Sequence, residues 1–406
     1  MSAEAKVPYA MAVYGQEEID AVNAVLKNPK HLVAGTAVKE FEKGIAQLFG
    51  KPYGVMTNSG SSANLIAFEM ANLPAGSEVI TPILTFSTTL NPILQKGLIP
   101  IFADVAAGTY VIDPDQVETL ITPQTKALMV PSLLGNLPAF DRLQEMARAY
   151  RLIFIEDSCD TVGATFAGRP TGEYTDISTT SFYASHIITA AGGGGMVCFH
   201  DKYLAQRALV MCNWGRQSTL FGVYHASEDI QKRFAGVIDG EPYDAKFLFT
   251  EIGYNFQPLE LQAAFGLVQL RRLGEFAERR RQNFAELITF LQKYEEFFIL
   301  PITHPLTRTN WLALPLTIRA SAPFSRLEIT RYLEEGGVQT RPIFTGNVLK
   351  QPAYESLSQK RTLTQGYPVT DGIMRRGFVI GCHHGLTREQ LDYLKELLAV
   401  FLNKYL

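Results

Sequence analysis

The sequence predicts an α/β protein in which helices cover a large, mostly parallel sheet. We expect this large sheet domain at residues 1–275 and a smaller α+β domain at residues 276–406. Two observations lead to this prediction. A chain of 406 residues is longer than one hydrophobic core usually supports, so two domains are expected. Between about residues 50 and 200, short strand-like apolar runs alternate with helix-like stretches, which is typical of a parallel sheet.

The strand-like runs of the first domain form a series along the chain. They are YGVMT, SEVITP, IPIFADV, KALMVPSL, RLIFIEDS and DISTTSFYA. Helices are expected from Ala63 to Met70 and from Phe140 to Tyr150, and TFSTTLNPILQKG reads as a loop entering a helix. Ligands of such sheets bind at the carboxyl ends of the strands, where the loops lie, so we expect a site there.

The pattern changes after residue 190. A four-glycine run, Gly192–Gly195, lets the backbone approach a ligand closely. Residues 213–250 are irregular and rich in polar and aromatic side chains, long enough for a functional excursion. A helix from about Pro258 to Arg281 would lead into the second domain. That domain is expected to contain NWLALPLTI, a helix from Arg326 to Glu335, VQTRPIF and GFVIGCH.

Composition and charge narrow the class of protein. The net charge of −3 gives no reason to expect nucleic acid or a membrane as partner. The first residues show no secretory signal, and no apolar run approaches the ~20 residues of a membrane span. The four cysteines are scattered without a CxxC pair, so we expect reduced thiols, a cytoplasmic setting and no metal site.

The segment Thr57–Asn64, with the sequence TNSGSSAN, lies between a predicted strand and a predicted helix. Its small residues would leave N–H groups free at the helix start, where the helix dipole also favours a phosphate. A capping motif on an ordinary helix explains the same residues equally well.

Two acids, Glu156 and Asp157, end the apolar run RLIFIED, and Asp160 follows closely. If the ligand were a cofactor with a pyridine ring, an aspartate at this position could pair with the protonated ring nitrogen and so make the ring an electron sink. The alternative is an ordinary loop aspartate that caps the next turn.

His186 ends the segment SFYASH, just before the glycine run. Its position after a strand favours a catalytic role, because imidazole transfers protons near neutral pH. A structural histidine is the competing interpretation.

Taken together and in order, several motifs resemble the DegT/DnrJ/EryC1/StrS sugar aminotransferase family. They are NSGSSAN, TFSTTLNP, IEDSCD, SFYASH with its glycines, and GYNFQPLELQAA, and the resemblance extends from about residue 8 to the C-terminus. It implies the type I fold of aspartate aminotransferase and a pyridoxal 5'-phosphate cofactor. Family members usually read S-F-H-x-x-K, in which the lysine holds the cofactor covalently. The equivalent position here, five residues after Ser181, is His186.

A histidine at this position resembles a smaller branch, the nucleotide-sugar 3-dehydratases, and Arg341–Tyr354 is similar to that branch as well. The branch uses pyridoxamine 5'-phosphate to remove the 3-hydroxyl of a nucleotide-activated 4-keto-6-deoxy hexose. One type acts on a CDP-sugar and needs an iron–sulfur cluster with clustered cysteines. Here Cys212 is followed by NWGR and by no cysteine before Cys382, so the resemblance points to the cluster-free type that acts on a GDP-sugar.

The resemblance also implies roles for individual residues. Gly60, Ser61 and Ser181 would hold the cofactor phosphate, and Phe86 would stack on the cofactor ring. Asp157 would pair with the ring nitrogen, and Asp160 would lie near the ring hydroxyl. His186 would be the general acid and base. Asn255 would reach the phosphate in a neighbouring subunit, which implies a homodimer with shared active sites. Arg216 would lie near the site and help to recruit the amino donor, which we expect to be glutamate. The family's E-G-G reads Gly192–Gly194 here, so the function of that glutamate is not carried over.

Two alternatives remain at this point. One is a catalytically idle member that only binds a cofactor or nucleotide sugar, for example as a regulator. The other is an ordinary aminotransferase that uses a different lysine, although the closest, Lys202, is far from His186 in sequence.

Overall fold

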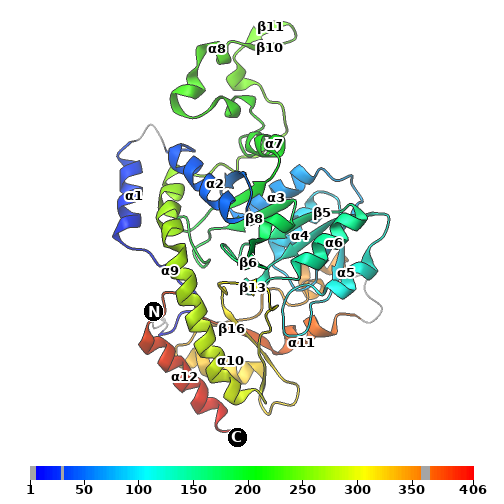
Figure 1. Ribbon diagram of the computed structural model, residues 1–406, viewed down its shortest axis with the longest axis vertical. Helices are drawn as coiled ribbons and strands as arrows, with labels where there is room; N and C mark the ends of the chain where they lie inside the picture. Colours follow the sequence, from blue (N-terminus) through cyan, green and yellow to red (C-terminus); the bar gives the residue numbers. More distant parts are fainter. Residues whose placement is uncertain (1–5, 29–31, 358–365) are drawn as a thin grey trace.

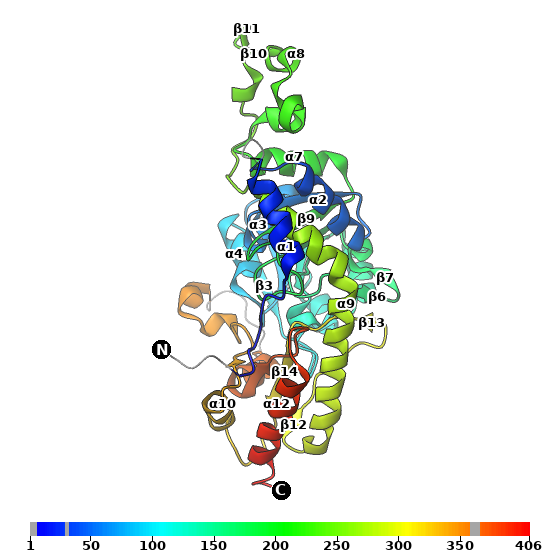
Figure 2. The ribbon, with the colours of Figure 1, turned by 90° about the vertical axis from the view of Figure 1, so that its left-hand side faces the viewer.

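The computed structural model describes residues 6–28, 32–357 and 366–406. Two sheets lie one above the other along the long axis of the molecule, and the long helix α9 (Glu260–Leu291) runs beside both (Figure 1). The turned view shows the same arrangement, with an extension at the end opposite to the C-terminus (Figure 2).

The large sheet has seven strands in the order β1-β9-β8-β5-β4-β2-β3. Its strands are β1 (Tyr53–Thr57), β2 (Glu78–Pro82), β3 (Ile99–Ala103), β4 (Thr125–Pro131), β5 (Ile153–Asp157), β8 (Ile177–Ser181) and β9 (Gly195–Phe199). β9 is antiparallel to both of its neighbours, while the pairs among β8, β5, β4, β2 and β3 are parallel. The carboxyl ends of β5 and β8 therefore lie side by side at one edge of the sheet.

Helices cover both faces of this sheet, which explains why its central strands are apolar throughout. One face packs against α3 (Gly60–Ala71), α4 (Ser87–Gln95) and α7 (Lys202–Cys212). The other face packs against α5 (Pro114–Leu120), α6 (Phe140–Tyr150), α2 (Thr36–Leu48) and the first half of α9. α1 (Gln16–Leu26) lies on the outer side of α9 (Figure 2).

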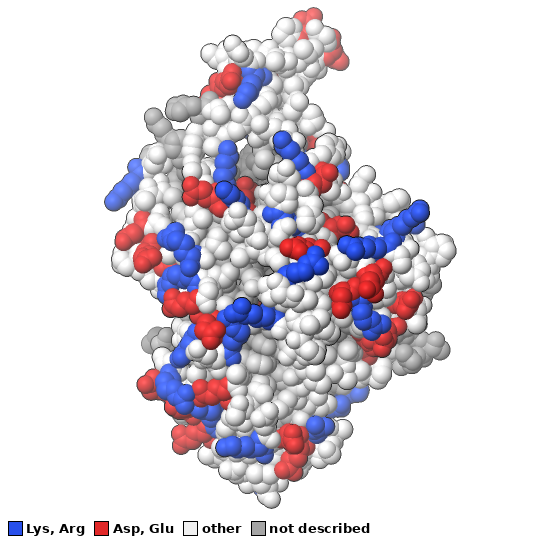
Figure 3. All heavy atoms as spheres, in the orientation of Figure 1, with Lys and Arg blue, Asp and Glu red and all other residues white. Residues whose placement is uncertain are grey.

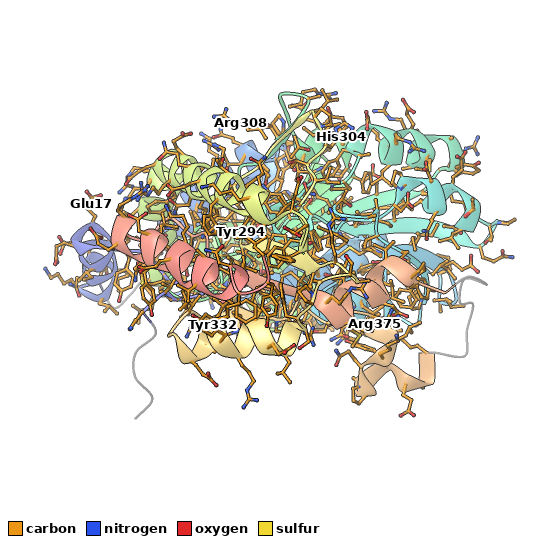
Figure 4. The ribbon with its side chains drawn as sticks, turned by 90° about the horizontal axis from the view of Figure 1, so that it is seen from below. Glu17, Tyr294, His304, Arg308, Tyr332 and Arg375 are labelled. Atoms are coloured by element: carbon orange, nitrogen blue, oxygen red, sulfur yellow. The ribbon has the colours of Figure 1, made fainter. Side chains whose placement is uncertain are left out.

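The small sheet is antiparallel, in the order β12-β14-β16-β15. Its strands are β12 (Phe298–Ile299), β14 (Leu314–Ile318), β15 (Thr340–Arg341) and β16 (Gly377–Ile380), and its helices are α10 (Arg326–Glu335), α11 (Pro368–Arg376) and α12 (Arg388–Leu402). The end of α9 packs into the same core. Tyr294, beside the end of α9, lies toward α12 (Figure 4), and its hydroxyl donates to the side-chain oxygen of Asn403 at 3.0 Å. Val7, near the start of the chain, pairs with Val338 and belongs to this core as well.

Residues 213–250 form an extension that projects from the large sheet beyond α7 (Figure 1). It consists of short elements, including α8 (Ile230–Arg233), β10 (Gly236–Ile238) and β11 (Glu241–Tyr243). A small three-stranded sheet, β13 (Thr307–Arg308), β6 (Thr165–Phe166) and β7 (Arg169–Pro170), joins the second half of the chain to the first.

The structure confirms the predicted fold class. Each strand-like run of the first domain contains a strand, and the predicted helices are present as α3, α4, α6, α9 and α10. β9 was not predicted, and α9 continues to Leu291 rather than ending near Arg281. The division at residue 275 stays a prediction.

None of the helices in the described ranges combines the length and the hydrophobicity needed to cross a bilayer. On the face shown in Figure 3, acidic and basic side chains lie interspersed, so this face has no large patch of a single charge.

Glu260, at the start of α9, fixes the neighbouring helix α2. Its carboxylate is 5% exposed and accepts hydrogen bonds from the backbone amides of Gly35, Ala37 and Val38 at 2.6, 2.7 and 3.2 Å. These amides belong to the first turn of α2, which has no side-chain cap of its own. A side chain distant in sequence thus acts as the helix cap.

We predict that Glu260→Gln lowers the free energy of unfolding by about 1–3 kcal/mol, because an amide donor would then face backbone donors in a buried place. Chemical denaturation measures the change. Glu275→Gln, at an exposed position of the same helix, is the matched control and should change stability little. Equal stability of the two variants would show that Glu260 does not hold α2.

Candidate active site

A cavity of about 540 Å³ opens where the carboxyl ends of β5 and β8 meet the start of α3. Seven of the residues singled out from the sequence line it: Gly60, Ser61, Phe86, Asp157, Asp160, Ser181 and His186. They come from four separate segments of the chain, which the fold brings together around one cavity.

The start of α3 lies directly against the end of β8. A Cβ on Gly60 would come within 2.5 Å of the Ser181 Cβ and 3.1 Å of the Cys159 sulfur, so only glycine fits. Ser59 caps the helix by accepting from the Ser62 amide at 3.1 Å. The amides of Gly60 and Ser61 remain at the positive end of the helix dipole, next to the Ser181 hydroxyl, which is an arrangement that suits a phosphate.

The glycine run passes beside this helix start. Gly194, with φ 123°, forms a bridge with Ser59, and a Cβ on Gly195 would lie 2.3 Å from the Ser59 carbonyl oxygen. Gly193 and Gly194 line the cavity. The run therefore allows β9 to lie against α3 and places no side chain in the cavity where Gly193 and Gly194 line it.

Asp157 ends β5 and is 6% exposed. One carboxylate oxygen accepts from the Asn64 amide at 2.8 Å and the Thr89 hydroxyl at 2.7 Å, and the other accepts from the Cys159 backbone amide at 3.2 Å. Thr179 in turn donates to the Asn64 side-chain oxygen at 2.6 Å. The carboxylate is held in one orientation, and it can still accept a further donor from the cavity.

Asp160 lines the same cavity and accepts a hydrogen bond from the Leu134 amide at 2.8 Å. Burial raises the pKa of this carboxyl to about 7, an effect that the Leu134 hydrogen bond partly opposes. Near neutral pH, Asp160 can therefore donate a proton as well as accept a hydrogen bond.

His186 lies in the turn that follows β8. Its Nδ1 is 3.2 Å from the Ser181 carbonyl oxygen. Because a carbonyl only accepts, Nδ1 must carry the proton, and the Nε2 lone pair of the neutral ring is left free. Burial lowers the pKa of this imidazole, and Arg280 lowers it further, whereas the Ser181 contact and Asp157 raise it. The side chain is thus arranged as a neutral base.

Among the cavity-lining residues that were not assigned a role from the sequence are Phe344, Tyr9 and Arg341. Phe86, 49% exposed, meets Phe344 edge-on with ring centroids 5.8 Å apart. Tyr9 and Arg341 also reach the cavity, and the Arg341 guanidinium lies 5.7 Å from the Tyr9 ring. Asn64 and Thr89, which orient Asp157, stood within the quoted motifs and could have been noted as its candidate donors.

Arg216 and Asn255 do not line this cavity. Arg216 lies at the base of the extension, over the rings of Trp214, Phe247 and Phe249 at 4.8, 5.4 and 5.8 Å, and borders a second cavity. Asn255 is exposed and bridges to Asn213. Within one chain, neither is positioned to contact a ligand beside His186.

We predict that Asp160→Asn stabilises the protein more at high pH than at low pH. Because the pKa is raised in the folded state, the neutral carboxyl's contribution is complete below about pH 4 and is lost as the pH rises to about 7. Asparagine keeps the Leu134 bond without titrating, so its relative stability should rise by between about 1 and 4 kcal/mol over this range. Denaturation at several pH values measures this. Asp115→Asn, at an exposed aspartate, should not reproduce the trend; a flat difference for Asp160→Asn would mean that the carboxyl is already ionised.

Known proteins resemble this chain over nearly its whole length. It is 37% identical over 386 residues to the dTDP-4-dehydro-2,6-dideoxy-D-glucose 3-dehydratase of Saccharopolyspora spinosa, covering 92% of this chain and 82% of that protein. It is 30% identical over 400 residues to the GDP-4-keto-6-deoxy-D-mannose 3-dehydratase of Yersinia pseudotuberculosis, covering 96% and 98%. A crystal structure of GDP-4-keto-6-deoxymannose-3-dehydratase with a trapped PLP-glutamate geminal diamine superposes with a TM-score of 0.84 at 29% identity, covering 97% of this chain and 100% of that chain.

The family model for the DegT/DnrJ/EryC1/StrS aminotransferases matches residues 13–399. This match covers both sheets and all of the cavity-lining segments except the one that contains Tyr9, and it confirms the resemblance inferred from the motifs. The chain belongs to the DegT/DnrJ/EryC1/StrS aminotransferase family.

Proposed function

We propose that this protein is a 3-dehydratase that uses pyridoxamine and pyridoxal 5'-phosphate to remove the 3-hydroxyl of a nucleotide-activated 4-keto-6-deoxy hexose. The observation that carries the proposal is the imidazole of His186 at the end of β8, where the family usually has a lysine, with Nε2 free. Relatives over the full length of the chain are 3-dehydratases of such sugars.

The residues of the cavity fit a pyridoxal-type cofactor. The helix start at Gly60 and Ser61, with the Ser181 hydroxyl, offers donors to a phosphate. Asp157 is held by Asn64 and Thr89 with capacity for one more donor, as a protonated pyridine nitrogen would require. The exposed ring of Phe86 can cover one face of the cofactor. A related protein has been seen with PLP and glutamate in this fold.

When bound, the cofactor supplies an electron sink for cleavage of bonds next to the substrate carbonyl carbon. The protein's own contribution is proton transfer and orientation. His186 accepts a proton at Nε2 while its Nδ1–H stays on the Ser181 carbonyl, and the resulting imidazolium can give the proton to the departing hydroxyl. Asp157, whose carboxylate is oriented by three donors, would accept a hydrogen bond from the protonated ring nitrogen.

The two alternatives are less well supported. An aminotransferase needs a lysine amine at the cofactor, and none of the cavity-lining residues in the described ranges is a lysine. A catalytically idle binding protein has no need of the free imidazole nitrogen or of the three hydrogen bonds that orient Asp157. In this protein, the His186 imidazole and the hydrogen-bonded Asp157 carboxylate line the same cavity.

We also propose a homodimer in which Asn255 and Arg216 complete the site of the partner subunit, because neither serves the cavity of its own chain. Glutamate is the proposed amino donor, supported by the glutamate found on PLP in the related structure. The nucleotide is left open, since one relative acts on a dTDP-sugar and another on a GDP-sugar. Four free cysteines accord with a cytoplasmic setting.

The proposal predicts the product of one incubation. With pyridoxal phosphate, glutamate and a panel of GDP-, dTDP- and CDP-4-keto-6-deoxy sugars, at least one sugar should give a product lighter by one oxygen atom, together with 2-oxoglutarate and ammonia. Mass spectrometry distinguishes this product from an amino sugar, which would indicate a transaminase. Absence of any conversion across the panel would favour the idle binding protein.

His186→Asn should retain cofactor and substrate binding and lose dehydration by about 10²–10⁴-fold, toward the upper end because one group serves two proton transfers. Single-turnover rates and melting temperature are to be measured on the same preparation. His200→Asn is the matched control, since the His200 ring also contacts a backbone carbonyl, that of Gly172 at 3.2 Å, outside the cavity. A fall in melting temperature with an unchanged rate would make His186 structural.

A further inference from the structure

Arg280, on α9, is a buried cation beside the active site. It is 0% exposed and donates to four groups from three segments: His384 Nδ1 at 3.1 Å, the carbonyl oxygens of Trp311 and Leu312 at 3.1 and 3.0 Å, and the carbonyl oxygen of His186 at 3.5 Å. Other arginines of α9, such as Arg272 and Arg281, have carboxylate partners. In the described part of the chain, Arg280 has no recorded carboxylate partner.

Such a group is costly to bury. An ion taken from water without a counter-charge loses several kcal/mol of solvation, which neutral acceptors recover only in part. Burial lowers the pKa of Arg280 only to about 10, so the guanidinium is still charged at neutral pH. Burial and the nearby Arg280 charge lower the pKa of His384, so its ring stays neutral and can accept at Nδ1. The protein therefore keeps a positive charge at a position where an uncharged side chain would cost less desolvation free energy.

The positive charge lies beside the catalytic turn, and the contacts of Arg280 span the junction of the two sheets. Trp311 and Leu312 precede β14, and His384 follows β16, so three of the four hydrogen bonds come from the small sheet's side. The fourth reaches the backbone of His186 itself. A displacement of the guanidinium would therefore move His186 relative to the cavity.

We propose that Arg280 is a positioning residue for His186, which anchors the His186 carbonyl to the junction of the two sheets and holds the imidazole in its neutral, proton-accepting form. The effect of Arg280 on catalysis rests on the proposed function, whereas its effect on the protonation of His186 does not. The neutral form is the one that a proton-abstracting base requires.

Several charged or titratable groups face His186. They are Tyr183 on its own turn, Asp157, Cys159 and Asp160 beyond β5, Tyr9 and Arg341 across the cavity, and Arg280 behind it. Asp157 favours the imidazolium and Arg280 opposes it. Removing the guanidinium would take away the charge that opposes Asp157 and leave burial as the remaining cause that lowers the His186 pKa, so this pKa should rise and the neutral fraction at a given pH should fall.

The test is an NMR titration of the protein with ¹⁵N-labelled histidine, in which the His186 signal is identified by its loss in His186→Asn. In Arg280→Met, the pKa of His186 should rise by about half a unit or more, and the low-pH limb of single-turnover dehydration should move upward by the same amount. Arg280→Lys keeps the charge and should titrate closer to the native protein while reducing kcat more than KM. Arg271→Met, at an exposed position of the same helix, is the control and should change neither.

The outcomes separate the possibilities. An unchanged His186 titration in Arg280→Met, with a loss of melting temperature and a rate reduced equally at all pH values, would make Arg280 purely structural and overturn the proposal. If Arg280→Met does not fold, Arg280→Gln removes the charge and keeps donors for the carbonyls; failure of both to fold would also overturn it. Because the titration needs no turnover, it stays decisive even if the dehydratase assay fails.

Discussion

The active site depends on the close approach of the start of α3 to the end of β8. Gly60 and Ser181 lie so near each other that a single added Cβ would force them apart. Ser181 has two consequences for the site: its hydroxyl stands beside the free amides of the helix start, and its carbonyl fixes the tautomer of His186. The glycines before β9 permit the same approach from the other side, because Gly194 and Gly195 lie against Ser59. The proposed phosphate site and the proposed proton-transfer site are therefore built on one contact between backbone segments.

Burial shifts the pKa values of Asp160 and His186, two of the titratable groups that line the cavity, in opposite directions, and in both cases it favours the neutral form. It raises the pKa of Asp160 and lowers that of His186. Asp157 is different because three donors converge on its carboxylate. A fixed anion thus lies beside groups that can exchange protons near neutral pH, and the buried cation Arg280 offsets that anion at the imidazole.

The sequence predicted the strands, helices and site residues that a local pattern determines, and it missed those that depend on contacts between distant segments. The strands β1 to β5 and β8 were visible as apolar runs because both faces of the sheet are covered. β9 was missed because its short run follows four glycines, and no local signal shows that a strand runs antiparallel to its neighbours. At the site, residues at strand ends and helix starts were predicted. Asn64, Thr89 and Arg280 were not, because they act through contacts between segments that lie far apart in sequence.

The exchange of lysine for histidine at position 186 leaves the proposed phosphate-binding and ring-binding residues of the family in place, while the family's E-G-G is replaced by Gly192–Gly194. A primary amine at the end of β8 could link covalently to a carbonyl cofactor, whereas a neutral imidazole bound through Nδ1 to a backbone carbonyl offers only a lone pair at Nε2. Of the groups proposed to bind and polarise the cofactor, those from α3, α4 and β5 make no recorded hydrogen bond to this side chain, whereas Ser181 of β8 contacts it through its carbonyl. The proposed partner of the ring nitrogen and the proposed base are therefore separate residues in this fold. A new reaction can arise at one strand end, provided that the backbone and the charge behind that residue hold the new base neutral and in place.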